Sequence, residues 1–299
     1  MAKRSRPLLH FASLFLLVSA CDRPGGLVTD DLGRRLAIPQ RIDRIVTLAP
    51  NVTEIVAFVD KQHLLVGADT FSNFPPEIRS LPKVGGVSPS VERIVELRPD
   101  LVLASSSVDP AALGRALESA GIPLFAVRTD RLADISRAID RVEDLLGTSK
   151  GEHSRRLTRA IESERRSRPR PPMILFLASV NPLYVAGRAT YIDDLITLTG
   201  GANAVAAHVT GWPQYSLEAL IASQPEIILH PASLLSGDER ERLLQADPRW
   251  RELEAVRLGS WFAVDDDIFT RPGPRVAAAA GQLNGILDRW EAGQSDRSR

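Results

Sequence analysis

The chain has 299 residues, of which 37 are lysine or arginine, 37 are aspartate or glutamate and 44% are hydrophobic. This length is typical of about two domains, and the balanced charge argues against a disordered chain and against a nucleic-acid-binding protein. A single cysteine excludes an intramolecular disulfide and a metal site built from several thiolates.

The first twenty residues have the pattern of a secretion signal. Three basic residues, Lys3, Arg4 and Arg6, precede a mainly apolar stretch over residues 8–20. That stretch is shorter than the about 20 residues that a membrane-spanning helix needs. Residues 1–20 are therefore predicted to be a signal peptide. Their removal deletes three basic residues and no acidic one, so the mature chain is slightly acidic.

Cys21 directly follows this apolar stretch. A lone cysteine is usually a small buried hydrophobic residue, but this position resembles the lipid-modified cysteine of bacterial lipoproteins. Several acyl chains on Cys21 would hold the protein stably at a membrane. Asp22 resembles the retention signal of inner-membrane lipoproteins, which implies anchoring at the periplasmic face of the inner membrane. Residues 21–41 are expected to be a tether, flexible over the Gly- and Asp-rich residues 23–33.

A unit of helix, turn and strand occurs twice, at residues 90–104 and 216–230. Each copy begins with a serine, Ser90 or Ser216, whose hydroxyl can cap the first helical turn. A proline ends each helix, and an apolar triplet then predicts a strand buried on both faces.

Buried strands and amphipathic helices alternate along both halves of the chain. Further strands are expected at 45–48, 64–66, 125–127, 173–178 and 262–264, and helices at 52–59, 131–146, 191–198 and 274–290. The predicted fold is α/β, with two similar lobes that have central, mostly parallel sheets, are joined by a single long α-helix and enclose a ligand cleft.

The connecting helix is predicted from residues 149–168, which are mostly polar. Leu157, Ala160 and Ile161 form one narrow apolar stripe, and Pro169 stops the helix. Such a segment is either an ordinary surface helix or a stiff spacer, and its place between two repeated units favours the spacer. The expected organisation is a signal peptide (1–20), a lipidated tether (21–41), an N-terminal lobe (42–148), the connecting helix (149–169), a C-terminal lobe (170–292) and a disordered tail (293–299).

The ligand site is expected where loops leave the carboxyl ends of the parallel strands, because such loops line the crevice in open α/β sheets. A large flat ligand needs broad apolar contacts and a few polar groups that fix its orientation. The aromatic candidates are Phe71, Phe74, Tyr184, Trp212 and Phe269, and the polar candidates are Asn51, Asp267 and Arg271.

Structural roles are open for some of these candidates. Phe71 and Phe74 could instead fix their loop to the lobe, and Asp267 and Arg271 could pair with each other. Trp212 lies between a glycine and a proline, where neither helix nor strand is favoured, so we interpret it as an exposed loop residue that binds ligand.

Two lobes, one connecting helix and a lipidated N-terminus resemble the helix-linked substrate-binding proteins of ABC importers. Residues 45–54 are similar to the first strand and helix of the vitamin B12 and iron-siderophore binders of this group. Three segments resemble its cobalamin-binding members: Phe71-Ser-Asn-Phe-Pro-Pro76, Gly211-Trp-Pro-Gln-Tyr-Ser-Leu-Glu218, and Asp267-Ile-Phe-Thr-Arg271 with the following Pro274-Arg275.

The resemblance implies a monomer that needs no cofactor of its own and binds cobalamin or a related corrinoid. The cobalamin-binding members carry tryptophans where this chain has Val87, Ser105 and Ile268. This difference leaves open a different corrinoid, haem or a ferric siderophore. Direct metal binding is not expected, because the histidines are scattered and none lies at helical ligand spacing.

Glu92 and Glu218 occupy the same position in the repeated unit, two residues after the capping serine. A carboxylate in the first turn interacts favourably with the helix dipole, and this alone could explain both residues. In the resembled family these two glutamates contact arginines of the two permease subunits. The resemblance therefore implies docking to an ABC importer permease dimer.

Two other classes of protein are weighed against this interpretation. An enzyme with Rossmann-like lobes is disfavoured, because the sequence has no G-x-G-x-x-G, P-loop or G-x-S-x-G motif. A lipoprotein scaffold that uses its lobes only for protein contacts remains an alternative.

Overall fold

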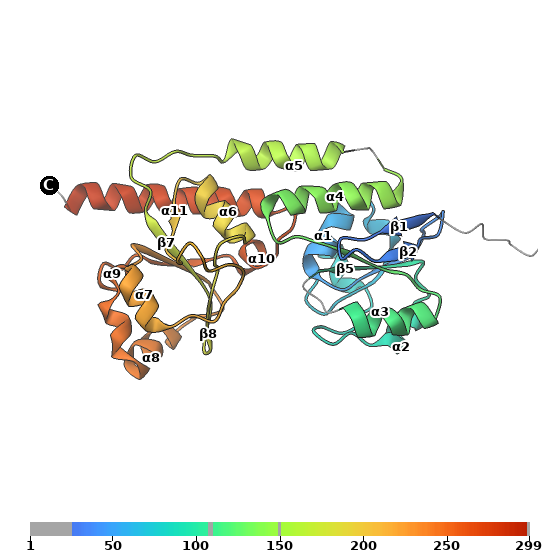
Figure 1. The fold of residues 1–299 in the computed structure, drawn as a ribbon, viewed down its shortest axis with the longest axis horizontal. Coiled ribbons are helices and arrows are strands. Elements are labelled where there is room, and N and C mark those ends of the chain that lie inside the picture. The colour runs from blue at the N-terminus through green and yellow to red at the C-terminus, as the bar shows by residue number, and fades with distance from the viewer. Residues whose placement is uncertain (1–25, 107–109, 149–150, 298–299) are drawn as a thin grey trace, which may run out of the picture.

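The computed structural model describes residues 26–106, 110–148 and 151–297, so the expected signal peptide and Cys21 lie outside the described residues. Within these ranges the chain forms two α/β lobes side by side (Figure 1). None of the helices in the described ranges is long and apolar enough to cross a membrane.

The N-terminal lobe has a parallel four-stranded sheet in the order β4-β3-β5-β6. Its strands are β3 (Ile45–Thr47), β4 (Leu65–Ala68), β5 (Leu101–Ser105) and β6 (Leu124–Val127). Its helices are α1 (Pro50–Phe58), α2 (Val91–Glu96), α3 (Pro110–Ser119) and α4 (Leu132–Leu146), with short 3₁₀ turns at Gln62–Leu64 and Pro76–Ser80. Successive strand residues point to opposite faces of the sheet, which α1 and α4 cover on one side and α2 and α3 on the other.

The C-terminal lobe has the strand order β11-β10-β7-β8, in which β8 is antiparallel to β7, and β9 also pairs with β7. Its strands are β7 (Met173–Val180), β8 (Leu183–Val185), β9 (Ala202–Asn203), β10 (Ile227–Pro231) and β11 (Trp261–Val264). Its helices are α6 (Tyr191–Leu198), α7 (Leu217–Ser223), α8 (Glu239–Ala246), α9 (Glu254–Arg257), α10 (Asp266–Phe269) and α11 (Val276–Arg297), with a 3₁₀ turn at Pro248–Glu252.

The predicted repeat is confirmed as α2-β5 and α7-β10. The Ser90 hydroxyl accepts a hydrogen bond from the Arg93 amide, and the Ser216 hydroxyl accepts one from the Ala219 amide. Both strands are buried along their whole length. The α/β class with two similar lobes and mainly parallel sheets is therefore confirmed.

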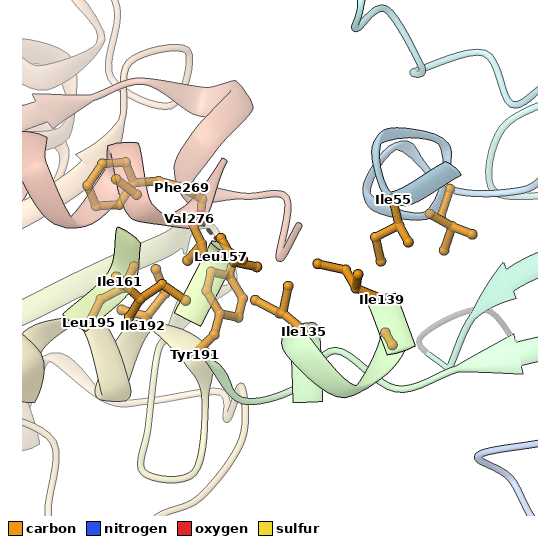
Figure 2. Close-up of a cluster of buried hydrophobic side chains, with 14 of the residues drawn as sticks. Ile55, Ile135, Ile139, Leu157, Ile161, Tyr191, Ile192, Leu195, Phe269 and Val276 are labelled. Atoms are coloured by element: carbon orange, nitrogen blue, oxygen red, sulfur yellow. Dashed lines mark hydrogen bonds between the residues drawn. The ribbon is translucent and has the colours of Figure 1, made fainter. Parts of the chain in front are cut away.

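One apolar cluster runs from lobe to lobe (Figure 2). Ile55 of α1 and Ile135 and Ile139 of α4 belong to it, as do Tyr191 of α6 and Val276 of α11. Because protein interiors are close-packed, lobes that share such a cluster cannot separate without opening a void.

The connecting helix is α5 (Glu152–Ser163), which lies along α4 and α11. It is shorter than the expected 149–169, because the chain after Ser163 bends onto the C-terminal lobe. There the buried guanidinium of Arg168 donates hydrogen bonds to the Thr199 carbonyl and to two carboxylates of α11. Leu157 and Ile161 are buried in the shared cluster, so α5 is packed against both lobes rather than standing free between them.

Two chain ends differ from expectation. Residues 26–37, expected to belong to a tether, form the hairpin β1 (Leu27–Thr29) and β2 (Arg35–Ala37) on the N-terminal lobe. The buried carboxylate of Asp30 holds this hairpin by accepting hydrogen bonds from Arg34 and from the Ala126 amide of β6. At the other end α11 continues to Arg297 through residues expected to be a disordered tail, because extending a formed helix costs far less than starting one.

Candidate ligand-binding site

The N-terminal lobe has a cavity of about 680 Å³ at the carboxyl edge of its sheet. The loop after β3, the loop after β4, the segment that leads into α2 and one face of α3 form its walls. Its lining is Leu48, Ala49, Pro50, Asp69, Phe71, Gly86, Val87, Ser88, Pro89, Val91, Ala112, Leu113 and Ala116. A hollow of this size with mainly apolar walls is typical of small-molecule sites.

Phe71 and Val87 form the most exposed part of this apolar wall. The ring of Phe71 is 55% exposed and packs against Gly86, where a Cβ atom would lie only 2.8 Å from the ring. Val87 is 90% exposed. The Phe71 ring is therefore held in place on one side and open on the other, as a ligand-contacting ring would be.

Trp212 contributes an aromatic surface from the C-terminal lobe. Trp212 is 43% exposed, and its ring makes edge-on and tilted contacts with two core rings, at centroid distances of 6.2 Å to Phe176 and 5.9 Å to Tyr191. Gly211 before it adopts φ of 71°, which glycine tolerates without strain. The loop thus presents an indole that packs on two core rings and stays partly open to solvent.

Charged residues link the two lobes beside these aromatic groups. The guanidinium of Arg275 donates hydrogen bonds of 2.6 and 2.9 Å to the carboxylate of Glu54 in α1, and it lies 4.4 Å from the ring centroid of Phe74. Arg271 donates a 2.6 Å hydrogen bond to the side-chain oxygen of Asn73 and a longer one to the Phe71 carbonyl. The loop before α11 is therefore fixed to the loop that follows β4.

Asp267 and Arg271 form an ion pair of 2.7 Å. The two side chains therefore do pair with each other, which is the structural role that the sequence left open for them. Asp267 also accepts a hydrogen bond from the Asn73 side chain, so the pair belongs to the link between the lobes. Because Asp267 is 38% exposed, its carboxylate also remains open to solvent.

Glu54 is a buried carboxylate in an otherwise largely apolar helix. Burial raises its pKa, while the hydrogen bonds and charge of Arg275 and the charge of Arg271 act in the opposite direction. Burial of a carboxylate without such partners would be unfavourable. Glu54 therefore depends on two arginines of the other lobe.

Three of the predicted site residues are less exposed to solvent than Phe71 and Trp212. Asn51 is buried and donates hydrogen bonds to the Thr129 hydroxyl and, across the lobes, to the Pro272 carbonyl. Tyr184 is half-buried on β8, and its backbone forms an antiparallel bridge with Gln214. Phe269 is 1% exposed and packs on Phe176, so a direct ligand contact by this ring finds no support: from α10 the ring points into the core.

Glu92 and Glu218 are both exposed at the starts of α2 and α7. Hydrogen bonds from its own backbone amide and from the Ser90 hydroxyl lower the pKa of Glu92. A backbone hydrogen bond and Arg249, which donates to the carboxylate at 2.5 Å, lower the pKa of Glu218. Both residues therefore carry a negative charge at neutral pH, and Glu218 already has a cationic partner.

Sequence reasoning missed Glu54, Asn73 and Arg275 as site residues. A signal for Glu54 was present, because it is the one acidic residue in the largely apolar segment that forms α1. Its partner could not be identified, because Arg275 lies 221 positions away. Within the described ranges, no three His, Cys, Asp or Glu side chains gather as a metal-binding group.

Two α/β lobes with an apolar hollow and exposed aromatic rings at their strand ends define a two-lobed ligand-binding protein. The sequence profile of the family described as "Periplasmic binding protein" matches residues 45–268, and the chain belongs to this family. It is accordingly a substrate-binding protein rather than an enzyme, and the resemblance found in the sequence is confirmed.

Curated relatives cover most of the chain. The vitamin B12-binding protein of Vibrio parahaemolyticus is 28% identical over 257 residues, which are 84% of this chain and 89% of that protein. The uncharacterized ABC transporter substrate-binding lipoprotein YvrC of Bacillus subtilis is 26% identical over 269 residues, covering 86% of this chain and 83% of YvrC.

Solved structures include binders of two different tetrapyrroles. The periplasmic heme-binding protein RhuT from Roseiflexus sp. RS-1, in its apo form, superposes with a TM-score of 0.72 at 29% identity, covering 83% of this chain and 98% of RhuT. The periplasmic vitamin B12-binding protein BtuF of Vibrio cholerae gives a TM-score of 0.69 at 25% identity, covering 84% of this chain and 98% of BtuF.

Proposed function

We propose that this protein captures cobalamin or a related corrinoid between its lobes and delivers it to the permease of an ABC importer. The observation that carries the proposal is the placement of exposed hydrophobic residues. Among the described residues seven large hydrophobic side chains are exposed, and four of them, Phe71, Phe74, Val87 and Trp212, belong to the candidate site. Large apolar surface left exposed in this way marks a binding site.

The chemistry of a corrinoid fits such a site. Its broad, flat ring system needs apolar walls, and its amide-bearing edges need hydrogen-bonding groups. The exposed rings of Phe71 and Trp212 supply apolar walls, and Asp267 supplies an exposed carboxylate that can accept hydrogen bonds. Relatives named vitamin B12-binding protein, which match over more than 80% of this chain, support the same ligand.

Haem is the second candidate, and Tyr184 is the observation that favours it. A protein-bound haem iron takes an axial ligand from His, Cys, Met or Tyr. Tyr184 forms an antiparallel backbone bridge with Gln214, which lies two residues from Trp212, so the tyrosine and the exposed tryptophan stand on neighbouring segments of the chain. The heme-binding protein RhuT, at 29% identity, supports this alternative. A ferric siderophore, which the sequence also leaves open, has no comparable support from a particular residue.

The deciding experiment is a calorimetric titration of the chain from residue 21 onward with cobalamin, cobinamide, haem and a ferric siderophore. We expect cobalamin or cobinamide to bind at least tenfold more tightly than haem. Haem binding that is tighter, and that weakens in a Tyr184→Phe variant, would replace the corrinoid proposal with the haem alternative.

A scaffold without a ligand is tested by the same samples. A ligand present at 100 times its Kd stabilises the folded state by about 2.7 kcal/mol. We therefore expect a clear rise in Tm with the correct ligand. No shift with any of the four compounds would favour the scaffold.

Anchoring and docking complete the proposed function. Cys21 would hold the protein by lipid at the periplasmic face of the inner membrane, and mass spectrometry of the N-terminal peptide from membranes tests this. Glu92 and Glu218, one on each lobe, would contact a permease dimer. Exposed charges of this kind govern register and association rate more than affinity.

A further inference from the structure

We propose that the outer face of the β1-β2 hairpin, together with the neighbouring end of α3, is a surface that docks on a bilayer rich in anionic phospholipid. The proposal rests on the lipid attachment at Cys21 described above. It adds an orientation to that attachment: the N-terminal lobe lies against the membrane instead of hanging from it.

The register of the hairpin determines which side chains face outward. Leu27 pairs with Ala37 and Thr29 pairs with Arg35. Directly paired residues of a two-stranded sheet share a face, and all four of these side chains are exposed. Val28 and Leu36 point the other way and pack on the core. The outer face therefore carries an apolar leucine and a cationic arginine side by side.

A cationic hollow lies between this hairpin and α3. Its volume is about 480 Å³, and Arg34, Arg35 and Arg115 contribute to its lining together with one acidic residue, Glu118. Arg34 is paired with Asp30, but Arg35 and Arg115 are exposed and form no ion pair with any residue of the described ranges. This hollow thus offers two unneutralised guanidinium groups, and guanidinium matches a phosphate in both charge and geometry.

Exposed leucines strengthen the match to a bilayer. Leu27 is 64% exposed and Leu32, in the turn of the hairpin, is 37% exposed. Of the seven exposed large hydrophobic side chains in the described residues, these two lie away from the candidate ligand site and beside the arginines. Arginines with adjacent apolar side chains are typical of surfaces that sit at a headgroup boundary.

The length of chain before the hairpin brings this face to the membrane. Leu27 lies six positions after Cys21, and a fully extended chain spans at most about 3.5 Å per residue. The attachment point is therefore within about 20 Å of the hairpin, whereas a folded chain of this size is about 45–50 Å across. Tethering over so short a distance gives a high effective concentration, at which even a weak patch stays bound.

The test is flotation of the unlipidated chain from residue 21 with vesicles at low ionic strength. One vesicle set is an equal mixture of phosphatidylglycerol and phosphatidylcholine, and the other is phosphatidylcholine alone. We expect binding to the anionic vesicles only. The double variant Arg35→Gln/Arg115→Gln should lower the partition coefficient about 20-fold, because each basic residue near an anionic surface contributes about fivefold.

The matched control neutralises two exposed arginines of the C-terminal lobe, Arg242→Gln/Arg257→Gln, at the other end of the molecule (Figure 1). It changes the net charge equally and should alter partitioning less than twofold. Equal losses in both variants, or equal binding to neutral vesicles, would overturn the proposal. A Leu27→Ser variant tests the apolar contribution with no change in charge, and unchanged partitioning would restrict the surface to the arginines.

Cobalamin titration of the same samples separates this inference from the proposed function. We expect both double variants to bind cobalamin like the parent chain, because none of the four arginines lies in the candidate ligand site. Vesicle binding without cobalamin binding would remove the ligand proposal and leave the membrane surface standing. Cobalamin binding without vesicle binding would remove the membrane surface and leave the ligand proposal standing.

Discussion

Arg275 of the C-terminal lobe and Glu54 of the N-terminal lobe form a paired hydrogen bond across the molecule, at 2.6 and 2.9 Å. Glu54 is only 3% exposed. Arg271 lies 3.8 Å from the same carboxylate. Together with the shared apolar cluster, this contact makes the two lobes one mechanical unit, so we expect ligand binding to be accompanied by small relative movements.

Replacing Arg275 with alanine should destabilise the protein by about 2–3 kcal/mol. Removing one partner of a buried ion pair typically costs about 3–5 kcal/mol, because the remaining charge is uncompensated, and Arg271 reduces that cost here. The Tm should fall by about 5–10 °C. Denaturant unfolding of both proteins measures the difference.

Two further variants test the explanation. Arg257→Ala removes an exposed arginine and should leave stability nearly unchanged. The double variant Glu54→Leu/Arg275→Met removes both charges and should be more stable than Arg275→Ala alone. If Arg275→Ala unfolds at the same denaturant concentration as the parent chain, the ion pair does not hold the lobes together.

His230 should make stability depend on pH. Burial lowers its pKa at the end of β10, the charge of Arg240 acts in the same direction, and a hydrogen bond with the Pro231 carbonyl opposes them. The unfolded chain therefore takes up a proton more readily than the folded one. The contribution of His230 to the free energy of unfolding should be fully present above the unfolded pKa of about 6.5. As the pH falls below that value, the free energy of unfolding should decrease by at most about 1.4 kcal/mol per pH unit.

The measurement is unfolding at pH 7 and pH 5 for the parent chain and for His230→Asn, whose amide can replace the ring nitrogen that faces Pro231. We expect the variant to lose less stability on acidification. His63, which is exposed, provides the control variant His63→Asn. A parent chain and a His230→Asn variant with parallel pH profiles would show that burial of this ring has no such effect.

The elements were predictable from the sequence because their signals are local. Apolar triplets between a proline and a polar loop predict buried strands, and Ser90 and Ser216 predict helix starts. The hairpin at residues 27–37 was missed because its glycines and aspartates suggest a tether, while its stability comes from Asp30, which bonds to a strand almost a hundred positions away.

The site was predictable only in part for the same reason. Phe71 and Trp212 are large rings in segments too rich in glycine and proline for helix or strand, so their exposure could be inferred. Phe269 lies in an equally suggestive segment, but a four-residue helix turns its ring into the core. Which side of a short helix faces a cleft depends on packing that no local pattern records.

Truncation of the exposed rings should weaken ligand binding. Phe71→Ala and Trp212→Ala each remove an aromatic surface on the order of 100 Å², which corresponds to about a 10- to 100-fold rise in Kd. Trp212→Phe keeps a ring and should cost much less. Val95→Ala shortens an exposed hydrophobic side chain outside the site and serves as the control. Calorimetry measures the Kd for cobalamin of all four variants. If the four values are the same, Phe71 and Trp212 do not form walls of the ligand site.

Charge reversal at the two exposed glutamates should separate docking from ligand capture. Glu92→Arg/Glu218→Arg places positive charge where a permease is expected to present arginines, and like charges in contact oppose association. We expect uptake of labelled cobalamin by cells to be abolished and the calorimetric Kd to stay within about twofold of the parent value, because neither residue lines the ligand site.

A matched reversal on the connecting helix controls for net charge. Glu152 and Glu162 are exposed on α5, at the opposite edge of the molecule from α2 and α7 (Figure 1). The variant Glu152→Arg/Glu162→Arg should therefore support normal uptake. If instead the Glu92/Glu218 variant transports cobalamin at the parent rate, these carboxylates only stabilise the first turns of their helices, and the permease contacts another surface.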